Sequence, residues 1–169
     1  LLVGAANAIN ATLYDKLSFD FAKDIVPVAS LCSVPIALLV NPAVPARTLA
    51  ELIAYARANP GKLSMASPGN GSPQHLAGEL LKSLAGIDLL HVPTKGTGPA
   101  VTEILSGRVP ITIATVPSVL NHVKAGKLRA LGLTSTRRSA SAPEYLPIAD
   151  QGLPGYEAAS WHGALAPRG

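Results

Sequence analysis

Two short loops rich in glycine and hydroxyl side chains carry the residues best suited to binding chemistry. The first reads SPGNGS from Ser67 to Ser72, with His75 three residues later, and the second reads TKGTG from Thr94 to Gly98. Glycine lets backbone amides approach a ligand closely, and the free amides that begin a helix favour negative charge. We therefore predict that these loops bind a carboxylate or another small anion.

Ten residues of the two loops are predicted to contact this anion. They are Ser67, Gly69, Asn70, Gly71, Ser72 and His75 in the first half of the site, and Lys95, Gly96, Thr97 and Gly98 in the second. Three of these side chains have structural alternatives. Ser72 also fits the N-cap of a helix, His75 could serve only in packing, and Lys95 could be an ordinary surface lysine.

Catalysis is not predicted from these residues. Ser72 and His75 lie within one helical turn, whereas a nucleophile and its base normally come from separate elements with a third, orienting group. The sequence GNGS also places its serine wrongly for a G-x-S-x-G nucleophile elbow. The 10 acidic residues do not cluster, so no pair of carboxylates suggests itself. A hydrolase that uses Ser72 is kept as an alternative.

Cofactor and metal sites are not expected either. The histidines, at positions 75, 91, 122 and 162, lack the spacing of metal motifs, and the glycine loops lack the phosphate-loop and dinucleotide patterns. The single cysteine, Cys32, excludes an intrachain disulfide. Because Cys32 stands between apolar residues, we predict that it is a small buried core residue.

The composition excludes two further classes. The net charge is +4, but the 14 lysines and arginines are scattered and aromatic residues make up only 4%, which argues against nucleic-acid binding. No apolar run reaches the roughly 18 residues of a transmembrane helix, so the chain is not expected to span a membrane. A mildly basic surface suits attraction of small organic anions.

A strand and a helix are expected to position each loop. Leu63 to Ala66 is predicted to be a strand, and the helix after it should begin at Ser72 and end at Gly86. The apolar stripe of this helix is predicted from residues spaced by four and their neighbours. These are Leu76, Leu80 and Leu84, with Ala77 and Leu81 beside them.

Strand and helix patterns alternate from about residue 36 to residue 134. This predicts an α/β layer with a mainly parallel central sheet flanked by helices. Ligands bind at the carboxyl ends of such strands, so both loops should lie on one edge. Residues 5–7 are expected to form a loop, residues 25–40 a strand bent at its prolines, and residues 100–105 the helix after the second loop.

Several longer stretches resemble the substrate-binding proteins of tripartite tricarboxylate transporters, often called the Bug family. The resemblance covers essentially the whole chain. Its motifs are YDKL and DFAKDIVPVA within residues 14–29, VNPAVPARTLAELI at 40–53, NPGKL at 59–63, GNGSPQHLAGEL at 69–80, HVPTKGTGPA at 91–100, KAGKLRAL at 124–131, and GLPGYE at 152–157 with Trp161.

The resemblance implies a periplasmic protein of the type II, Venus-flytrap binding fold. Such proteins hold a di- or tricarboxylate, or a related acid, in a cleft between two lobes and deliver it to a membrane permease. Loop amides, hydroxyl groups and ordered waters usually hold the carboxylate. The same fold could instead report ligand occupancy to a signalling partner, which the sequence does not distinguish from transport.

Family members have roughly 300 residues, so the resemblance also implies that about the first and last quarters are absent from this chain. Residues 1–33 would then be part of the first lobe, 34–159 the second, ligand-binding lobe, and 160–169 a return strand through the hinge. Two positions depart from the family pattern. Thr94 stands where an aromatic residue is common, and Ala114 lies where an aspartate is common.

Overall fold

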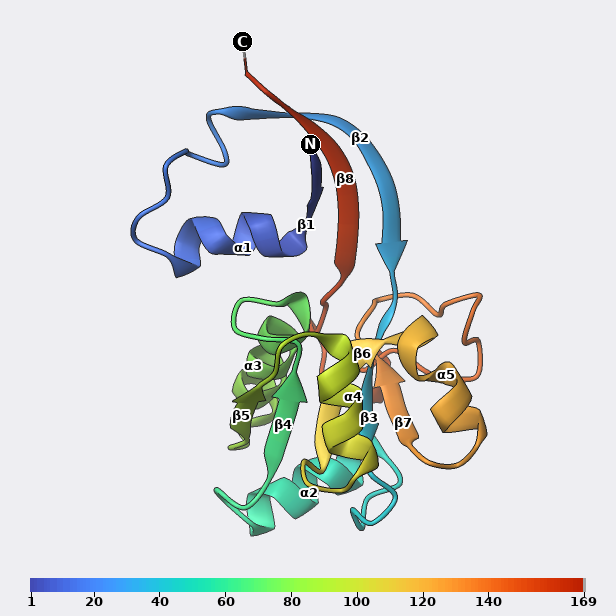
Figure 1. Ribbon diagram of the computed structural model, residues 1–169. Coiled ribbons are helices and arrows are strands. Elements are labelled where there is room, and N and C mark those ends of the chain that lie inside the picture. Colours follow the sequence, from blue (N-terminus) through green and yellow to red (C-terminus); the bar gives the residue numbers. More distant parts are fainter. Residues whose placement is uncertain (169) are drawn as a thin grey trace.

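Two β-sheets organise the computed structural model, which describes residues 1–168 (Figure 1). The smaller sheet has the strand order β1-β8-β2, with both neighbouring pairs antiparallel. Its strands are β1 (Leu2–Gly4), β2 (Ile25–Val34) and β8 (Ser160–Pro167). The larger sheet has the order β5-β4-β6-β3-β7. Its strands are β3 (Ile36–Val40), β4 (Ser64–Ser67), β5 (Leu90–Pro93), β6 (Ile111–Thr115) and β7 (Arg129–Leu133).

Four of the five strands in the larger sheet run in one direction. β4 pairs in parallel with β5 and with β6, whereas β3 lies antiparallel to both β6 and β7. The predicted mainly parallel sheet is therefore confirmed, with β3 as its reversed member. β3 is reversed because it continues from β2 after a break at Pro35 and enters from the edge that faces the smaller sheet (Figure 1).

Helices cover both faces of the larger sheet. These helices are α2 (Leu49–Ala58), α3 (Pro73–Ala85), α4 (Thr97–Leu105) and α5 (Val116–Lys124). A further helix, α1 (Ala5–Leu13), lies beside the smaller sheet, and a 3₁₀ turn is found at Ala149–Gln151 (Figure 1). One core cluster joins Ile36, Leu38 and Val40 to α2 and α3, and a second joins Ala37 and Leu39 to α4 and α5. Alternate side chains of β3 thus enter opposite cores, which explains its unbroken apolar sequence.

Helix α3 begins and ends where the sequence predicts. The Ser72 hydroxyl accepts the His75 N–H, Pro73 is the first helical residue, and Gly86 ends the helix at φ +59°. The predicted apolar stripe is only partly correct, however: Ala77 and Leu81 are buried, but Leu76 and Leu84 are more than 40% exposed. The buried face instead carries smaller residues, because the helix lies close to the sheet. They are Gln74, Ala77, Gly78, Leu81 and Ala85.

Three other local predictions need correction. Residues 5–7 begin helix α1 rather than forming a loop, because the Asn7 side chain accepts the Gly4 N–H at 3.0 Å and caps the first turn. Helix α4 starts at Thr97, three residues before the predicted position. Cys32 is exposed rather than buried, because the part of β2 around it is left uncovered on the smaller sheet.

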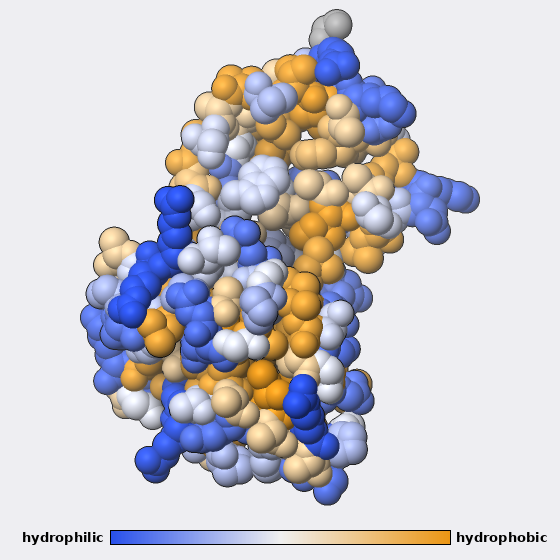
Figure 2. Space-filling model, turned by 180° about the vertical axis from the view of Figure 1, so that it is seen from behind, coloured by the Kyte–Doolittle hydropathy of each residue, from blue (hydrophilic) through white to orange (hydrophobic). Residues whose placement is uncertain are grey.

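Apolar side chains gather on the part of the molecule that contains the smaller sheet (Figure 2). Among residues 1–168, most of the exposed large apolar side chains lie before residue 32. They are Leu1, Leu2, Leu13, Tyr14, Leu17, Phe19, Val28 and Leu31. The three hydrophobic core clusters, in contrast, lie between residues 36 and 156. The larger sheet therefore has a core of its own, and the smaller sheet has little.

Tyr156 supports α3 from the core side. Its ring is fully buried, and its hydroxyl donates a hydrogen bond to the Ala77 carbonyl oxygen at 2.9 Å. Burial raises the pKa of the Tyr156 hydroxyl, so the group stays protonated and remains a donor. The bond joins the segment before β8 to the helix that follows the first glycine loop.

Replacing Tyr156 with Phe should lower the free energy of unfolding by about 1 kcal/mol, because the Ala77 carbonyl loses a buried donor. Urea unfolding followed by circular dichroism measures the change. Tyr55→Phe is the matched control, since Tyr55 is only partly buried, and it should shift stability by less than about 0.5 kcal/mol. Equal stability of the two variants would contradict the assigned role of the Tyr156 hydroxyl.

Candidate functional site

The two predicted loops lie side by side because the strands that precede them are parallel neighbours. Ser67 at the end of β4 pairs with Pro93 at the end of β5. The Thr94 N–H then donates to the Ser67 carbonyl oxygen at 2.9 Å, and the Gly96 N–H donates to the Pro68 carbonyl oxygen at 3.0 Å. The prediction that both loops share one edge of the sheet is confirmed.

The first loop satisfies most of its polar groups internally. The Gly69 N–H donates to Ser67 Oγ and the Gly71 N–H to His75 Nδ1, each at 3.2 Å. The Ser72 hydroxyl donates to the Gly69 carbonyl oxygen at 2.7 Å. These two glycine amides therefore point into the loop rather than outward as the sequence suggested. Asn70, between them, is exposed at the tip of the loop.

The second loop opens helix α4 without a capping side chain. Gly96 is the N-cap at φ +113°, and the first two helical residues are Thr97 and Gly98. Lys95 is exposed and takes part in none of the ion pairs found within residues 1–168. The first turn of α4 and the Lys95 ammonium thus place positive potential at this edge, which favours an anion.

A pair of histidines lies directly behind the first loop. The imidazole rings of His75 and His91 stack with their centroids 3.9 Å apart and their planes inclined by 17°. His91 Nε2 lies 2.6 Å from Ser67 Oγ, and His75 Nε2 lies 3.8 Å from a Glu79 carboxylate oxygen. Burial lowers the pKa of His91, and the neighbouring His75 lowers it further, so His91 is held neutral.

The serines of the site are poorly placed for nucleophilic catalysis. The Ser72 hydroxyl is bonded to the Gly69 carbonyl and the His75 backbone N–H, not to an imidazole. Ser67 does contact the imidazole of His91, but its side chain has no exposed surface. A nucleophile needs access to its substrate as well as a base. The geometry therefore favours loop shaping as the role of both hydroxyl groups.

Helix α1 covers the first loop from the side of the smaller sheet. A methyl group placed on Gly71 would lie 2.5 Å from Leu13 Cδ2 and 3.5 Å from Asn10 Oδ1. Sequence reasoning missed α1, His91 and Thr94 as parts of the site. The Asn7 cap could have indicated α1, whereas the other two depend on strand pairing, for which the sequence carries no local signal.

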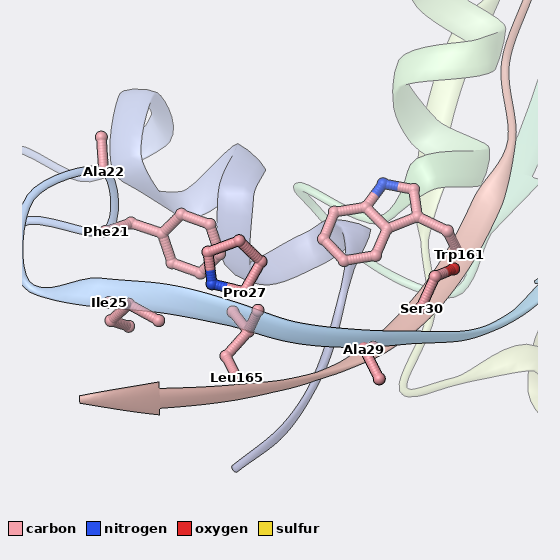
Figure 3. A pocket seen from close by; sticks show the side chains of 9 residues that line it. Phe21, Ala22, Ile25, Pro27, Ala29, Ser30, Trp161 and Leu165 are labelled. Carbon is pink, nitrogen blue, oxygen red and sulfur yellow. The ribbon is translucent and has the colours of Figure 1, made fainter. Parts of the chain in front are cut away.

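Two of the larger cavities lie outside the ten predicted residues. One, of about 380 Å³, lies on the smaller sheet, where Phe21, Pro27 and Trp161 gather on one face (Figure 3). The other, of about 510 Å³, is a groove between α1 and α3 that Leu76 and Leu80 line. Within residues 1–168, no cluster of three or more potential metal ligands occurs, and no helix has the length and hydropathy that crossing a bilayer would require.

Comparison with known proteins identifies the family. The model of the tripartite tricarboxylate transporter family receptor, TctC, matches residues 1–169. The chain belongs to this family. It is 40% identical over 162 residues to the UPF0065 protein in the tcbD-tcbE intergenic region of Pseudomonas sp. strain P51, covering 95% of this chain and 48% of that protein. It is 36% identical to BugT of Bordetella pertussis, covering 96% and 50%.

Solved structures of the family have the same fold. R. palustris Rpa4515 with adipate superimposes with a TM-score of 0.88 at 36% identity, over 99% of this chain and 56% of that one. MatC from Rhodopseudomonas palustris with bound malate gives 0.88 at 29% identity, over 99% and 57%. The periplasmic binding protein BugD gives a TM-score of 0.89 at 29% identity, over 100% and 56%, which confirms the periplasmic-binding-protein fold predicted from the resemblance. The chain spans about half the length of the relatives it matches.

Gly71→Ala should lower stability by more than Gly61→Ala. Both glycines have φ near +70°, so both substitutions carry a left-handed strain of about 1–2 kcal/mol. Only at position 71 does the new methyl group meet Leu13, and because the exposed Leu13 side chain can turn away, the added loss should be at most about 1 kcal/mol. Urea unfolding of both variants measures the difference, and Leu13→Ala in the Gly71→Ala background should remove it. Equal losses would contradict the α1 contact.

The protein should lose stability as the pH falls below about 6.5, the ordinary pKa of histidine. The folded chain holds His91 neutral at a lowered pKa, so the unfolded chain takes up the proton first and is favoured by acid. Urea unfolding at several pH values measures this dependence. His91→Gln should reduce the loss on acidification, whereas His122→Gln, on α5, should leave it unchanged. An identical pH dependence in His91→Gln would contradict the assignment.

Proposed function

We propose that this chain forms the larger part of the ligand-binding lobe of an extracytoplasmic solute-binding protein, one that captures a small organic carboxylate for a tripartite tricarboxylate transporter. The observation that carries the proposal is the pairing of two glycine-rich loops, each opening a helix, at one edge of the larger sheet. The family membership supports it, as do the dicarboxylates adipate and malate in Rpa4515 and MatC.

The ten predicted residues would serve this site in two ways. Asn70, Lys95, Thr97 and Gly98 are at least partly exposed at the edge and would face the carboxylate. The others would mainly hold the loops in shape, since their polar groups are bonded within the loops or their backbone occupies a left-handed conformation. They are Ser67, Gly69, Gly71, Ser72, His75 and Gly96.

We divide the chain into lobes on the same basis. Residues 34–159 would form the second, ligand-binding lobe around the larger sheet, and residues 1–33 and 160–169 would belong to the first lobe and the hinge. The exposed apolar side chains before residue 32 support this division, because a sheet with so little core of its own needs further cover. The final residue of the return segment, Gly169, lies outside the described residues.

The activity proposed is binding and delivery without a chemical step and without a cofactor or metal. The ligand would be captured in the periplasm and released to the membrane components of the transporter. Specificity would come from the fit of a second carboxylate or another polar group of the ligand against the opposite lobe. Hydrogen bonds from fixed amides and attraction to one cation bind an anion more strongly in a partly desolvated cleft than on a surface in full contact with water.

Carboxylate binding can be tested by nuclear magnetic resonance on the ¹⁵N-labelled chain. Titration with adipate or malate at millimolar concentration should shift the amide signals of Asn70, Thr97 and Gly98. Adipamide, which has the same length but no charge, should leave them in place. The expected loss on replacing Lys95 with Gln is a weakening of about two- to fivefold, the range of one partly exposed charge.

Two results would argue against this function. One is the absence of amide shifts with any of a panel of mono-, di- and tricarboxylates. The other is a set of shifts confined to residues away from the two loops, for example around Trp161 in the cavity on the smaller sheet. Lys62→Gln, at an exposed lysine outside the two loops, is the control for a general change of charge.

A further inference from the structure

A polar cluster behind the first loop connects three separate elements. Ser67 is the last residue of β4, His91 lies on β5, and His75 lies in the first turn of α3. Ser67 Oγ and His91 Nε2 are 2.6 Å apart, the closest side-chain contact in this part of the molecule, and the His91 ring stacks on His75. The cluster therefore connects both strands of the site to the helix between them.

The backbone amides of Gly69 and Gly71 both donate hydrogen bonds to side chains of this cluster. The Gly69 N–H donates to Ser67 Oγ, and the Gly71 N–H donates to His75 Nδ1. The two glycines have φ values of +143° and +73°, which L-residues with side chains rarely adopt. These contacts fix the backbone on both sides of Asn70. The orientation of the exposed tip is therefore decided by groups that are themselves buried or only partly exposed.

The hydrogen bond from Gly71 decides which nitrogen of a neutral His75 ring carries the proton. Because Nδ1 accepts the Gly71 N–H, the neutral ring carries its proton on Nε2, which faces Glu79. A ring protonated on both nitrogens would turn an N–H toward the Gly71 N–H and lose that bond. The charged or titratable groups that act on His91 are His75, Glu79 and Lys82, all from α3. A second proton in the pair would place two positive rings 3.9 Å apart.

We propose that His91 is a positioning residue for the anion site: through Ser67 and His75 it holds the first loop in the conformation that presents Asn70. This inference rests on the proposed carboxylate function for its effect on affinity. Its effect on the loop can be observed without any ligand.

The two contributions of His91 can be separated by substitution. His91→Phe keeps a ring to stack on His75 but removes the contact with Ser67, whereas His91→Gln places a polar group near the position of Nε2. Ser67→Ala removes the same contact from the other side but also removes the acceptor of the Gly69 N–H, so in this variant the Gly71 amide, which donates to His75, tests the idea even if His91→Phe does not fold. His122→Phe, on α5, is the matched control for introducing a phenyl ring at a partly buried histidine.

Hydrogen exchange of the Gly69 and Gly71 amides in the ligand-free chain is the first readout. Both amides should exchange about five- to tenfold faster in His91→Phe, and the Gly71 amide should do so in Ser67→Ala, the change expected on losing one hydrogen bond. His91→Gln should stay within about twofold of the wild-type rate, and His122→Phe should match it. Unchanged exchange of the Gly71 amide in both His91→Phe and Ser67→Ala would overturn the proposal.

Adipate titration is the second readout. The dissociation constant should rise by about five- to tenfold in His91→Phe and be largely restored in His91→Gln. If wild-type chain binds no acid, the carboxylate function fails, while the exchange rates still decide the role of His91. If exchange accelerates but affinity is unchanged, the loop does not present the ligand groups, and the positioning role is overturned.

Discussion

The parallel pairing of β4 and β5 is the constraint on which the site depends. It aligns Ser67 with Pro93, so that the chain leaves both strands at the same level of the sheet. The Thr94 N–H then bonds to the Ser67 carbonyl oxygen and its hydroxyl lies 2.8 Å from the Gly96 carbonyl oxygen. A shift of one residue would separate the loops and turn His91 to the other face of the sheet.

The first loop, which follows β4, is contacted on two sides. On the sheet side, Ser67, His91 and His75 take up the glycine amides. On the other side, Leu13 of α1 lies against Gly71, so that a methyl group there would meet the end of the leucine side chain. The loop thus has little freedom of its own, and an anion at its tip would meet preorganised groups, which reduces the entropy lost on binding.

The sequence allowed the local parts of this arrangement to be predicted. Ser72, Pro73 and Gly86 act through their own backbone or nearest neighbours, so the limits of α3 were correct. Which face of α3 is buried could not be predicted in the same way. Leu76 and Leu80 face the groove beneath α1, because Gly78 packs closely on Met65 of the sheet. The role of His91 likewise depends on the register between β4 and β5. The exposure of Cys32 depends on which other parts of the protein pack on β2.

The connection between the two sheets limits how the loop and α1 can move apart. The chain passes between the sheets at Pro35 and again at Ala159. On the side of the larger sheet, the Pro35 carbonyl accepts the Val116 N–H at 2.9 Å and the Ala158 N–H donates to Thr134 at 2.9 Å. On the other side, β2 and β8 are already paired at Val34 and Ser160. A change in the angle between the sheets must therefore be taken up by the backbone around Pro35 and Ala159. Such a change would move Leu13 relative to Gly71. It would leave Ser67, His75 and His91 in place relative to one another, because all three belong to the larger sheet and its helix.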